Sequence, residues 1–235
     1  MSALETSLCG WSNLGATAAV GVAAGPRWHT LAELAGNARG VASEVASAYG
    51  TTTTVGGTFV LARAARAVAE PCLHALLDAN CLPLLRPDAV TVHLNGLARF
   101  DRVAFHSPSE GPAGATVLAT GLIDTFGGFV EALRSAIPVG RRGLWGLVSD
   151  AVGGAGVSLA ARHSNALAAV GQVLDELEHL HGSTARPAWI LRDGDIELQR
   201  GSCCLAFHLD GHGYCETCPV GRRRDGTSPM RPAST

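Results

Sequence analysis

Four cysteines near the C-terminus form the most chemically distinctive pattern in this sequence. Cys203 and Cys204 are adjacent, and Cys215 and Cys218 follow them in the spacing Cys-Cys-x10-Cys-x2-Cys. Four thiolates are the ligand set of a [2Fe-2S] cluster, because each tetrahedral iron takes two protein ligands beside two bridging sulfides. The pattern therefore predicts that these four cysteines bind a [2Fe-2S] cluster.

The spacing also predicts how the backbone brings the sulfurs together. Cys215-Glu-Thr-Cys218 suits a tight turn, and Gly211 and Gly213 make it sterically easy for the preceding segment to fold back. Consecutive side chains of an extended strand point to opposite faces. We therefore expect a local distortion of the backbone at Cys203 and Cys204.

Other uses of these cysteines are possible. A structural zinc module generally uses two separated Cys-x2-Cys turns, and the adjacent pair disfavours it. A thiol–disulfide oxidoreductase would place Cys215 and Cys218 at the start of a helix after a strand, whereas here Pro219 and a polar tail follow. His208 or His212 could replace a thiolate as in Rieske centres, but four cysteines already complete the ligand set.

The other three cysteines are scattered among apolar residues at positions 9, 72 and 81. A free cysteine commonly behaves as a small buried hydrophobe, so we predict that Cys9, Cys72 and Cys81 are core thiols. The total of seven is odd, and the N-terminus shows no secretion signal. Metal or redox chemistry is therefore favoured over a disulfide framework.

The overall composition excludes several functional classes. A length of 235 residues suits one domain with a short appendage, and 47 % of the residues are hydrophobic. The formal net charge of -2 gives no electrostatic footprint for nucleic acid or an anionic membrane. The apolar stretch 15–25 is too short to span a bilayer. We expect a cytoplasmic protein that is not membrane-spanning and has no Gly-x-Gly-x-x-Gly nucleotide site.

Helical signals cover most of the chain before the cysteines. Thr30 and Glu33 form a capping box, which predicts a helix from about Leu31. Residues 59–77 have helical spacing, although Pro71 should bend or divide that helix. Further helices are predicted near 129–136, 144–152 and 157–181, the last from a stripe of leucine and valine residues.

Two hairpins complete the predicted architecture. Residues 90–94 and 97–105 flank Asn95-Gly96, and residues 189–191 and 196–198 flank Asp193-Gly194, both typical two-residue turns. The predicted fold is therefore α+β and predominantly helical, with two small antiparallel β-hairpins and a C-terminal cysteine-rich segment. We divide the chain into a helix-rich domain (1–199), a cluster-binding segment (200–220) and a flexible tail (221–235).

The cysteine segment resembles the C-terminal motif of the FhuF-like ferric siderophore reductases. Arg200-Gly-Ser-Cys-Cys-Leu and Cys215-Glu-Thr-Cys-Pro219 match its adjacent cysteines, ten-residue spacing and final Cys-x2-Cys-Pro. The upstream order of helices, hairpin and the Leu144-Trp145-Gly146 helix is also similar. Glu216 and His208 depart from the residues expected there, which leaves open how the cluster potential is tuned and how substrate is held.

The resemblance implies an enzyme that reduces a ferric siderophore and releases ferrous iron by one-electron transfer. Hard oxygen donors hold ferric iron far better than ferrous iron, so one electron loosens the metal. The electron donor would be a ferredoxin or a flavin-dependent reductase. Arg222–Arg224 could attract an acidic donor protein or an anionic chelate, although a solvated tail is the favoured explanation. Arg141 and Arg142 could line a chelate pocket, and an exposed interhelical turn explains them equally well. A siderophore-binding protein without turnover is the alternative.

Overall fold

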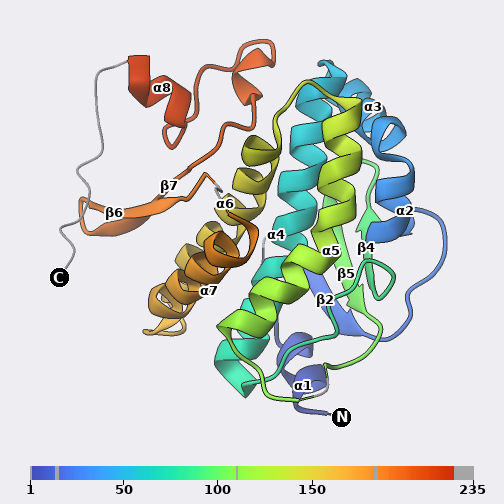
Figure 1. Cartoon of the computed structure of the whole chain (residues 1–235), viewed down its shortest axis with the longest axis vertical. Coiled ribbons are helices and arrows are strands. Elements are labelled where there is room, and N and C mark those ends of the chain that lie inside the picture. The colour runs from blue at the N-terminus through green and yellow to red at the C-terminus, as the bar shows by residue number, and fades with distance from the viewer. Residues whose placement is uncertain (1, 14–15, 110, 183–184, 225–235) are drawn as a thin grey trace.

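The computed structural model describes residues 2–13, 16–109, 111–182 and 185–224, and the fold is α+β and mainly helical, as predicted (Figure 1). The helices are α1 (Ala3–Cys9), α2 (Leu31–Gly36), α3 (Ala38–Ala48), α4 (Thr53–Ala79), α5 (Ala115–Ala136), α6 (Arg141–Ala160), α7 (Ala166–His181) and α8 (Pro219–Arg224). The strands are β1 (Ser12–Asn13), β2 (Ala16–Val20), β3 (Trp28–Thr30), β4 (Val90–Leu94), β5 (Phe100–Phe105), β6 (Ala188–Arg192) and β7 (Asp195–Gln199).

The capping box predicted at Thr30 is present. The Thr30 hydroxyl accepts a hydrogen bond from the Glu33 backbone N–H at 3.0 Å, and the Glu33 carboxylate accepts one from the Thr30 N–H at 2.8 Å. These bonds satisfy two of the amides that a helix start leaves without intrahelical partners. Helix α2 therefore begins at Leu31, as the sequence indicates.

The long helix α4 forms the centre of the bundle. It continues through Pro71 for 27 residues, so of the two predicted alternatives, one bent helix or two helices, the structure has a single helix. Proline removes one backbone hydrogen bond, but Pro71 is buried among residues packed on both sides of the helix. Helices α1, α3, α5 and α6 all pack against α4, and this surrounding core holds it continuous.

The second half of the chain differs from its predicted boundaries. The helix expected at 129–136 begins already at Ala115, and the one expected at 144–152 extends from Arg141 to Ala160. The predicted helix 157–181 is wrong as a single element, because residues 161–165 separate α6 from α7. The leucine and valine stripe is nevertheless core: Val170, Val173, Leu174 and Leu177 are buried.

Helix α5 is long and apolar enough to cross a membrane by length and composition. It packs against α2, α3, α4, α6 and α7, and its buried face includes Leu122, Phe126 and Phe129. A helix surrounded in this way is typical of a protein core.

The first predicted hairpin is the middle of a larger sheet. Strands β4 and β5 pair antiparallel, and the full strand order is β1-β2-β5-β4-β3, with β2 parallel to β5. The sheet lies behind α4 and α5 in Figure 1. Its connecting turn is longer than predicted, because β5 begins at Phe100 rather than at Leu97. The Asn95 side chain closes this loop by accepting hydrogen bonds from the Leu97 and Arg99 amides.

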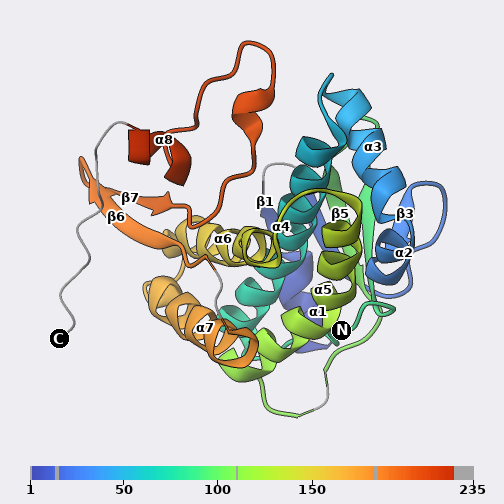
Figure 2. The same cartoon turned by 45° about the horizontal axis from the view of Figure 1, so that its top comes forward.

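The second hairpin has the predicted two-residue turn. Asp193 and Gly194 have φ angles of 52° and 93°, which the type I′ turn requires. Strands β6 and β7 form a separate sheet that lies beside α6, away from the main bundle in both views (Figures 1 and 2). The Trp189 indole fixes the hairpin by donating a hydrogen bond to the Gly153 carbonyl at 3.1 Å. This hairpin delivers the chain to the cysteine segment.

Candidate metal centre

The backbone changes direction where Cys203 and Cys204 leave strand β7. The strand ends at Gln199, so both cysteines lie outside the extended geometry that would point them to opposite faces. Leu205 adopts a left-handed conformation with φ of 62°, and a 3₁₀ helix follows at Ala206–His208. The Leu205 N–H also donates to the Cys203 sulfur at 3.4 Å. This is the distortion that the adjacent cysteines predict.

Two of the four sulfurs are already at the separation that one metal requires. The sulfurs of Cys203 and Cys218 lie 3.6 Å apart. Metal–sulfur bonds of about 2.3 Å at a tetrahedral angle place two ligand sulfurs roughly 3.8 Å apart. The pair therefore fits as two ligands of a single tetrahedral iron.

The other two cysteines lie beside this pair. Cys204 and Cys218 both raise the pKa of Cys215 through their charges, after the larger effect of burial. Within the described ranges, no three His, Cys, Asp or Glu side chains are close enough to hold one metal ion together. The four thiols thus gather in one region of the chain, with one pair at ligand spacing.

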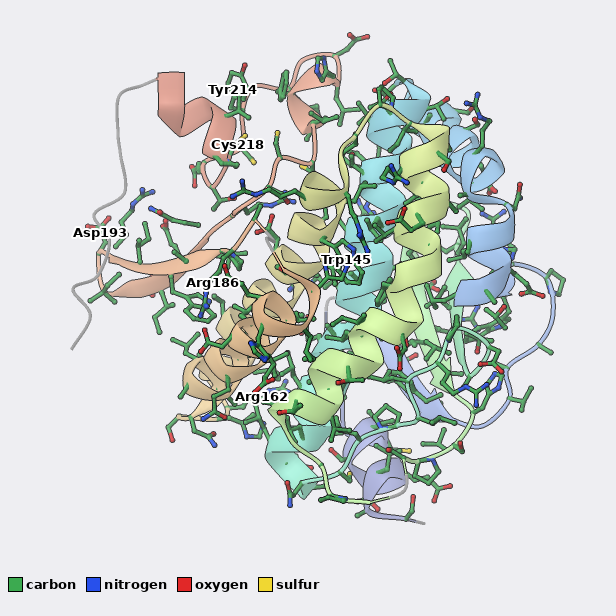
Figure 3. All side chains as sticks on the ribbon, in the orientation of Figure 1. Trp145, Arg162, Arg186, Asp193, Tyr214 and Cys218 are labelled. Atoms are coloured by element: carbon green, nitrogen blue, oxygen red, sulfur yellow. The ribbon has the colours of Figure 1, made fainter. Side chains whose placement is uncertain are left out.

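A tight turn positions Cys215 and Cys218, as predicted. The Cys218 N–H donates to the Cys215 carbonyl at 2.8 Å, and helix α8 begins at the next residue. Burial opposes ionisation of Cys218, but hydrogen bonds from the Gly221 and Val220 amides outweigh it and lower the pKa of this thiol. Figure 3 shows Cys218 on the inner side of the segment, near Tyr214.

Burial raises the pKa of Cys203 to about 12, and the neighbouring Cys218 sulfur contributes in the same direction. Metal ligands must be deprotonated thiolates, so cluster assembly here releases protons.

A buried carboxylate on helix α6 anchors the start of the segment. Asp150 is 4 % exposed and accepts hydrogen bonds from the Gly201 amide at 2.7 Å and the Ser202 amide at 3.1 Å. It also accepts one from the Ser202 hydroxyl at 2.6 Å. Burial raises the pKa of Asp150, although these donors and Arg200 favour its charged form. The sequence analysis did not identify Asp150 as a residue that anchors the segment. The available signal was its position as a single acidic residue within an otherwise apolar helix.

Cys204 is held by contacts with Arg200 and with Thr58. Arg200 donates to Asp150 at 3.3 Å, and its guanidinium also hydrogen-bonds the Cys204 side chain. Helix α4 holds the backbone, because the Thr58 hydroxyl donates to the Cys204 carbonyl at 2.7 Å. A positive charge beside a ligand of a cluster influences the reduction potential of that cluster.

A cavity of about 460 Å³ adjoins Cys204. Residues of α4, α6 and β7 form its walls together with Arg200, Ala206 and Thr217 of the cysteine segment. Its size is within the range of ligand sites in proteins. A molecule bound there would therefore lie next to one of the four cysteines.

The remaining predicted residues lie in other surroundings. His208 is exposed and stacks on Phe207 at a ring distance of 4.1 Å, and His212 is exposed. Arg141 pairs with Glu131 at 2.9 Å. The Arg222–Arg224 side chains and the tail residues 225–235 lie outside the described residues. Residues 221–224 of the predicted tail belong to α8.

Of the three predicted core thiols, Cys72 is fully buried and Cys81 is half-buried. The prediction for Cys9 is wrong, because this residue ends α1 and is exposed. The apolar neighbours that suggested burial face the core from other sides of the short helix, where Leu4 and Leu8 are buried.

Comparison with protein families agrees with this geometry. The model of the FhuF 2Fe-2S C-terminal domain matches residues 200–219, which include all four cysteines. A comparison with curated proteins finds no match. The segment is thus a [2Fe-2S] domain of the FhuF type, and its cofactor is a [2Fe-2S] cluster. The match is consistent with the FhuF-like family and indicates an iron–sulfur protein.

Proposed function

We propose that this protein reduces a ferric siderophore by one electron and releases ferrous iron, with Cys203, Cys204, Cys215 and Cys218 as the cluster ligands. The observation that carries the proposal is the position of Cys204, which belongs to the [2Fe-2S] domain and also lines a ligand-sized cavity. Such a cluster stores and transfers a single electron when bound. Cys204 is the cluster ligand that lines the cavity, so the electron would reach a chelate there through this residue.

The reaction requires an external reductant. A ferredoxin or a flavin-dependent reductase supplies one electron, ferric iron in the chelate becomes ferrous, and the chelating ligand is not covalently changed. Hard oxygen donors bind ferrous iron weakly, so the reduced metal dissociates. We place this chemistry in the cytoplasm.

The exposed and buried sides of the segment suit the two halves of the reaction. Cys215 and Tyr214 are exposed, so a protein donor can approach that side, whereas Cys204 faces the cavity. The Cys203–Cys218 distance favours these two residues on one iron, which leaves Cys204 and Cys215 for the other.

The test begins with protein purified without oxygen. Iron and sulfide are counted, and the visible spectrum is recorded before and after dithionite. We expect about two irons and two sulfides per chain and a red-brown spectrum that bleaches on reduction. The reduced protein is then mixed with a ferric siderophore and a ferrous-specific chelator, and ferrous iron is expected in proportion to cluster reoxidation.

Three outcomes separate the alternatives. Multiple turnover with a chemical or protein donor supports a reductase. A reducible cluster that binds the chelate but releases no ferrous iron would indicate a siderophore-binding protein. Colourless protein that contains zinc, even after reconstitution with iron and sulfide, would refute the electron-transfer function.

A further inference from the structure

Three arginines line the cavity beside Cys204, and one of them contacts a cysteine side chain. Arg63 and Arg66 belong to α4, and Arg200 belongs to the cysteine segment. Arg66 forms an ion pair with Glu70 at 3.2 Å, within the same helix. Among the contacts of the described residues, Arg200 is the member of this set whose guanidinium hydrogen-bonds a cysteine, Cys204. Arg200 is therefore the arginine that can act on a bound cluster.

Arg200 is fixed through its side chain and through its backbone. Its Nε donates to the Asp150 carboxylate at 3.3 Å, and the side chains of Arg200 and Asp150 are 18 % and 4 % exposed. The Arg200 N–H donates to the Thr217 carbonyl at 3.3 Å, in the turn between Cys215 and Cys218. The guanidinium thus has a defined place between helix α6 and the cysteines.

The charge of Arg200 acts on a second cysteine besides Cys204. Burial has the largest effect on the pKa of the Cys215 thiol and raises it, and the charge of Arg200 acts in the opposite direction. A guanidinium group is not deprotonated in proteins. Arg200 therefore provides a permanent positive charge near two of the four cysteines.

We propose that Arg200 raises the reduction potential of the cluster, with Asp150 as the residue that positions it. The proposal rests on the four ligands assigned in the proposed function. One-electron reduction adds a negative charge to a site that already has four thiolate ligands. A fixed positive charge beside that site stabilises the reduced state more than the oxidised state, and solvent screens a largely buried charge only weakly. Asp150 has the opposite charge, so its own effect on the potential has the opposite sign.

The potential is measured on the cluster-loaded protein by titration with dithionite in the presence of redox dyes, followed by visible absorption. Arg200→Gln removes the charge and keeps a side chain that forms hydrogen bonds. We expect it to lower the equilibrium constant for reduction at least tenfold, a decrease of about 59 mV for a one-electron couple. Arg200→Lys retains the charge and should remain within about threefold of the wild type.

Asp150→Asn separates an effect of charge from an effect of structure. It removes the negative charge paired with Arg200, so it should raise the equilibrium constant for reduction by about threefold or more. If the two residues only held the segment in place, both variants would loosen it, and the potential would shift in the same direction in both. Opposite shifts are therefore the signature of the charges.

Arg192→Gln is the matched control. It also removes one positive charge from an ion pair, that of Arg192 with Glu197 at 3.2 Å, but the Arg192 side chain is 51 % exposed on the hairpin. Solvent and salt screen a charge at such a site. The potential of this variant should equal that of the wild type. Iron and sulfide counts verify that every variant holds the cluster.

An unchanged potential in Arg200→Gln, an equal shift in Arg192→Gln, or shifts of Arg200→Gln and Asp150→Asn in the same direction would each overturn the proposal. If Arg200→Gln does not hold the cluster, Asp150→Asn decides: an increase supports the proposal, and a decrease or no change overturns it.

The titration contains no siderophore, so its result is independent of reductase activity. If the wild type has a reducible cluster but releases no ferrous iron from a chelate, the reductase function fails and the potentials still test Arg200. If ferrous iron is released with turnover but the potential of Arg200→Gln equals that of the wild type, the reductase function holds and the role of Arg200 is wrong.

Discussion

Different interactions stabilise two regions of the molecule. One is the body, which comprises the described residues up to the end of β7 (2–199), and the other is the cysteine segment that follows it. In the body, large side chains such as Phe105, Phe126, Phe129 and Trp145 are almost fully buried between helices and sheet. In the described part of the chain after β7, Cys218 is the one buried apolar side chain, and Tyr214 and Cys215 are exposed. The body is therefore stabilised by the burial of large apolar side chains. The segment is held to it by polar contacts and by a few partly buried side chains, those of Cys204, Leu205, Ala206 and Leu209.

This difference has a functional consequence. Cys215 is exposed, so a cluster bound there can exchange electrons with a docked protein. The opposite side is fixed to the body through Asp150 and Thr58, which belong to two helices that also line the cavity. In the proposed reaction, the body would hold the substrate side and the exposed segment would serve the donor side.

The largest effect is expected from removing one ligand. Cys203→Ser should abolish the cluster, because serine does not replace the thiolate of the pair at 3.6 Å. The body should retain its helical content and its thermal midpoint within about 2 °C, since no large apolar contact is lost. Visible absorption and far-UV circular dichroism measure the two properties on the same sample.

Cys81→Ser is the matched control, because this half-buried thiol lies outside the segment. It should retain full cluster absorbance. Unfolding of the body in Cys203→Ser would show that the metal stabilises the whole chain, and the contrast between the two regions would then be wrong.

A smaller effect is expected at the contact between body and segment. Asp150→Asn removes the charge that pairs with Arg200 and leaves that buried guanidinium without its carboxylate partner. Breaking a buried pair of this kind costs about 3 kcal/mol. The segment should detach more often, so that a chelator removes iron from the variant at least about tenfold faster. The thermal midpoint of the body should change less than the rate of iron loss.

Ser149→Ala is the control for this experiment. Ser149 is the neighbouring residue on α6, and its buried hydroxyl has no hydrogen-bond partner among the described residues. Its removal should leave iron loss at the wild-type rate. If Asp150→Asn also loses iron at that rate, Asp150 does not anchor the segment.

The parts of this arrangement that local sequence encodes were predictable, and those made by distant contacts were not. The Thr30 capping box, the Asp193-Gly194 turn and the cysteine spacing depend on residues close in the chain. The parallel pairing of β2 with β5 joins segments about 85 residues apart. Asp150 reaches residues 51 and 52 positions away, so no local pattern indicated its role.

The positions of the cavity arginines could not be predicted from local sequence either. On the sequence, Arg63 and Arg66 are polar positions of an amphipathic helix, whereas Arg141 and Arg142 stand out as a charged pair. Arg141 forms an ion pair with Glu131. The packing of α4 in the bundle places Arg63 and Arg66 in the same cavity wall as Cys204. Tertiary structure alone distinguishes the two sets.

The smallest effect concerns the body and its response to acid. His74 on α4 is 7 % exposed and lies against His163, with a ring distance of 5.6 Å. Burial lowers the pKa of His74 below its usual value of 6.5, and His163 and Arg162 lower it further, while Asp78 opposes the shift. The unfolded chain therefore binds the proton more readily than the folded chain.

The contribution of His74 to stability is fully present above pH 6.5 and decreases as the pH falls below 6.5 towards the folded-state pKa. The decrease is at most about 1.4 kcal/mol per pH unit for one group. His74→Leu should flatten the pH dependence of urea unfolding between about pH 7.5 and pH 5.5, whereas His179→Gln, at an exposed position on α7, should not. An unchanged slope in His74→Leu would mean that other buried groups control the acid response of the body.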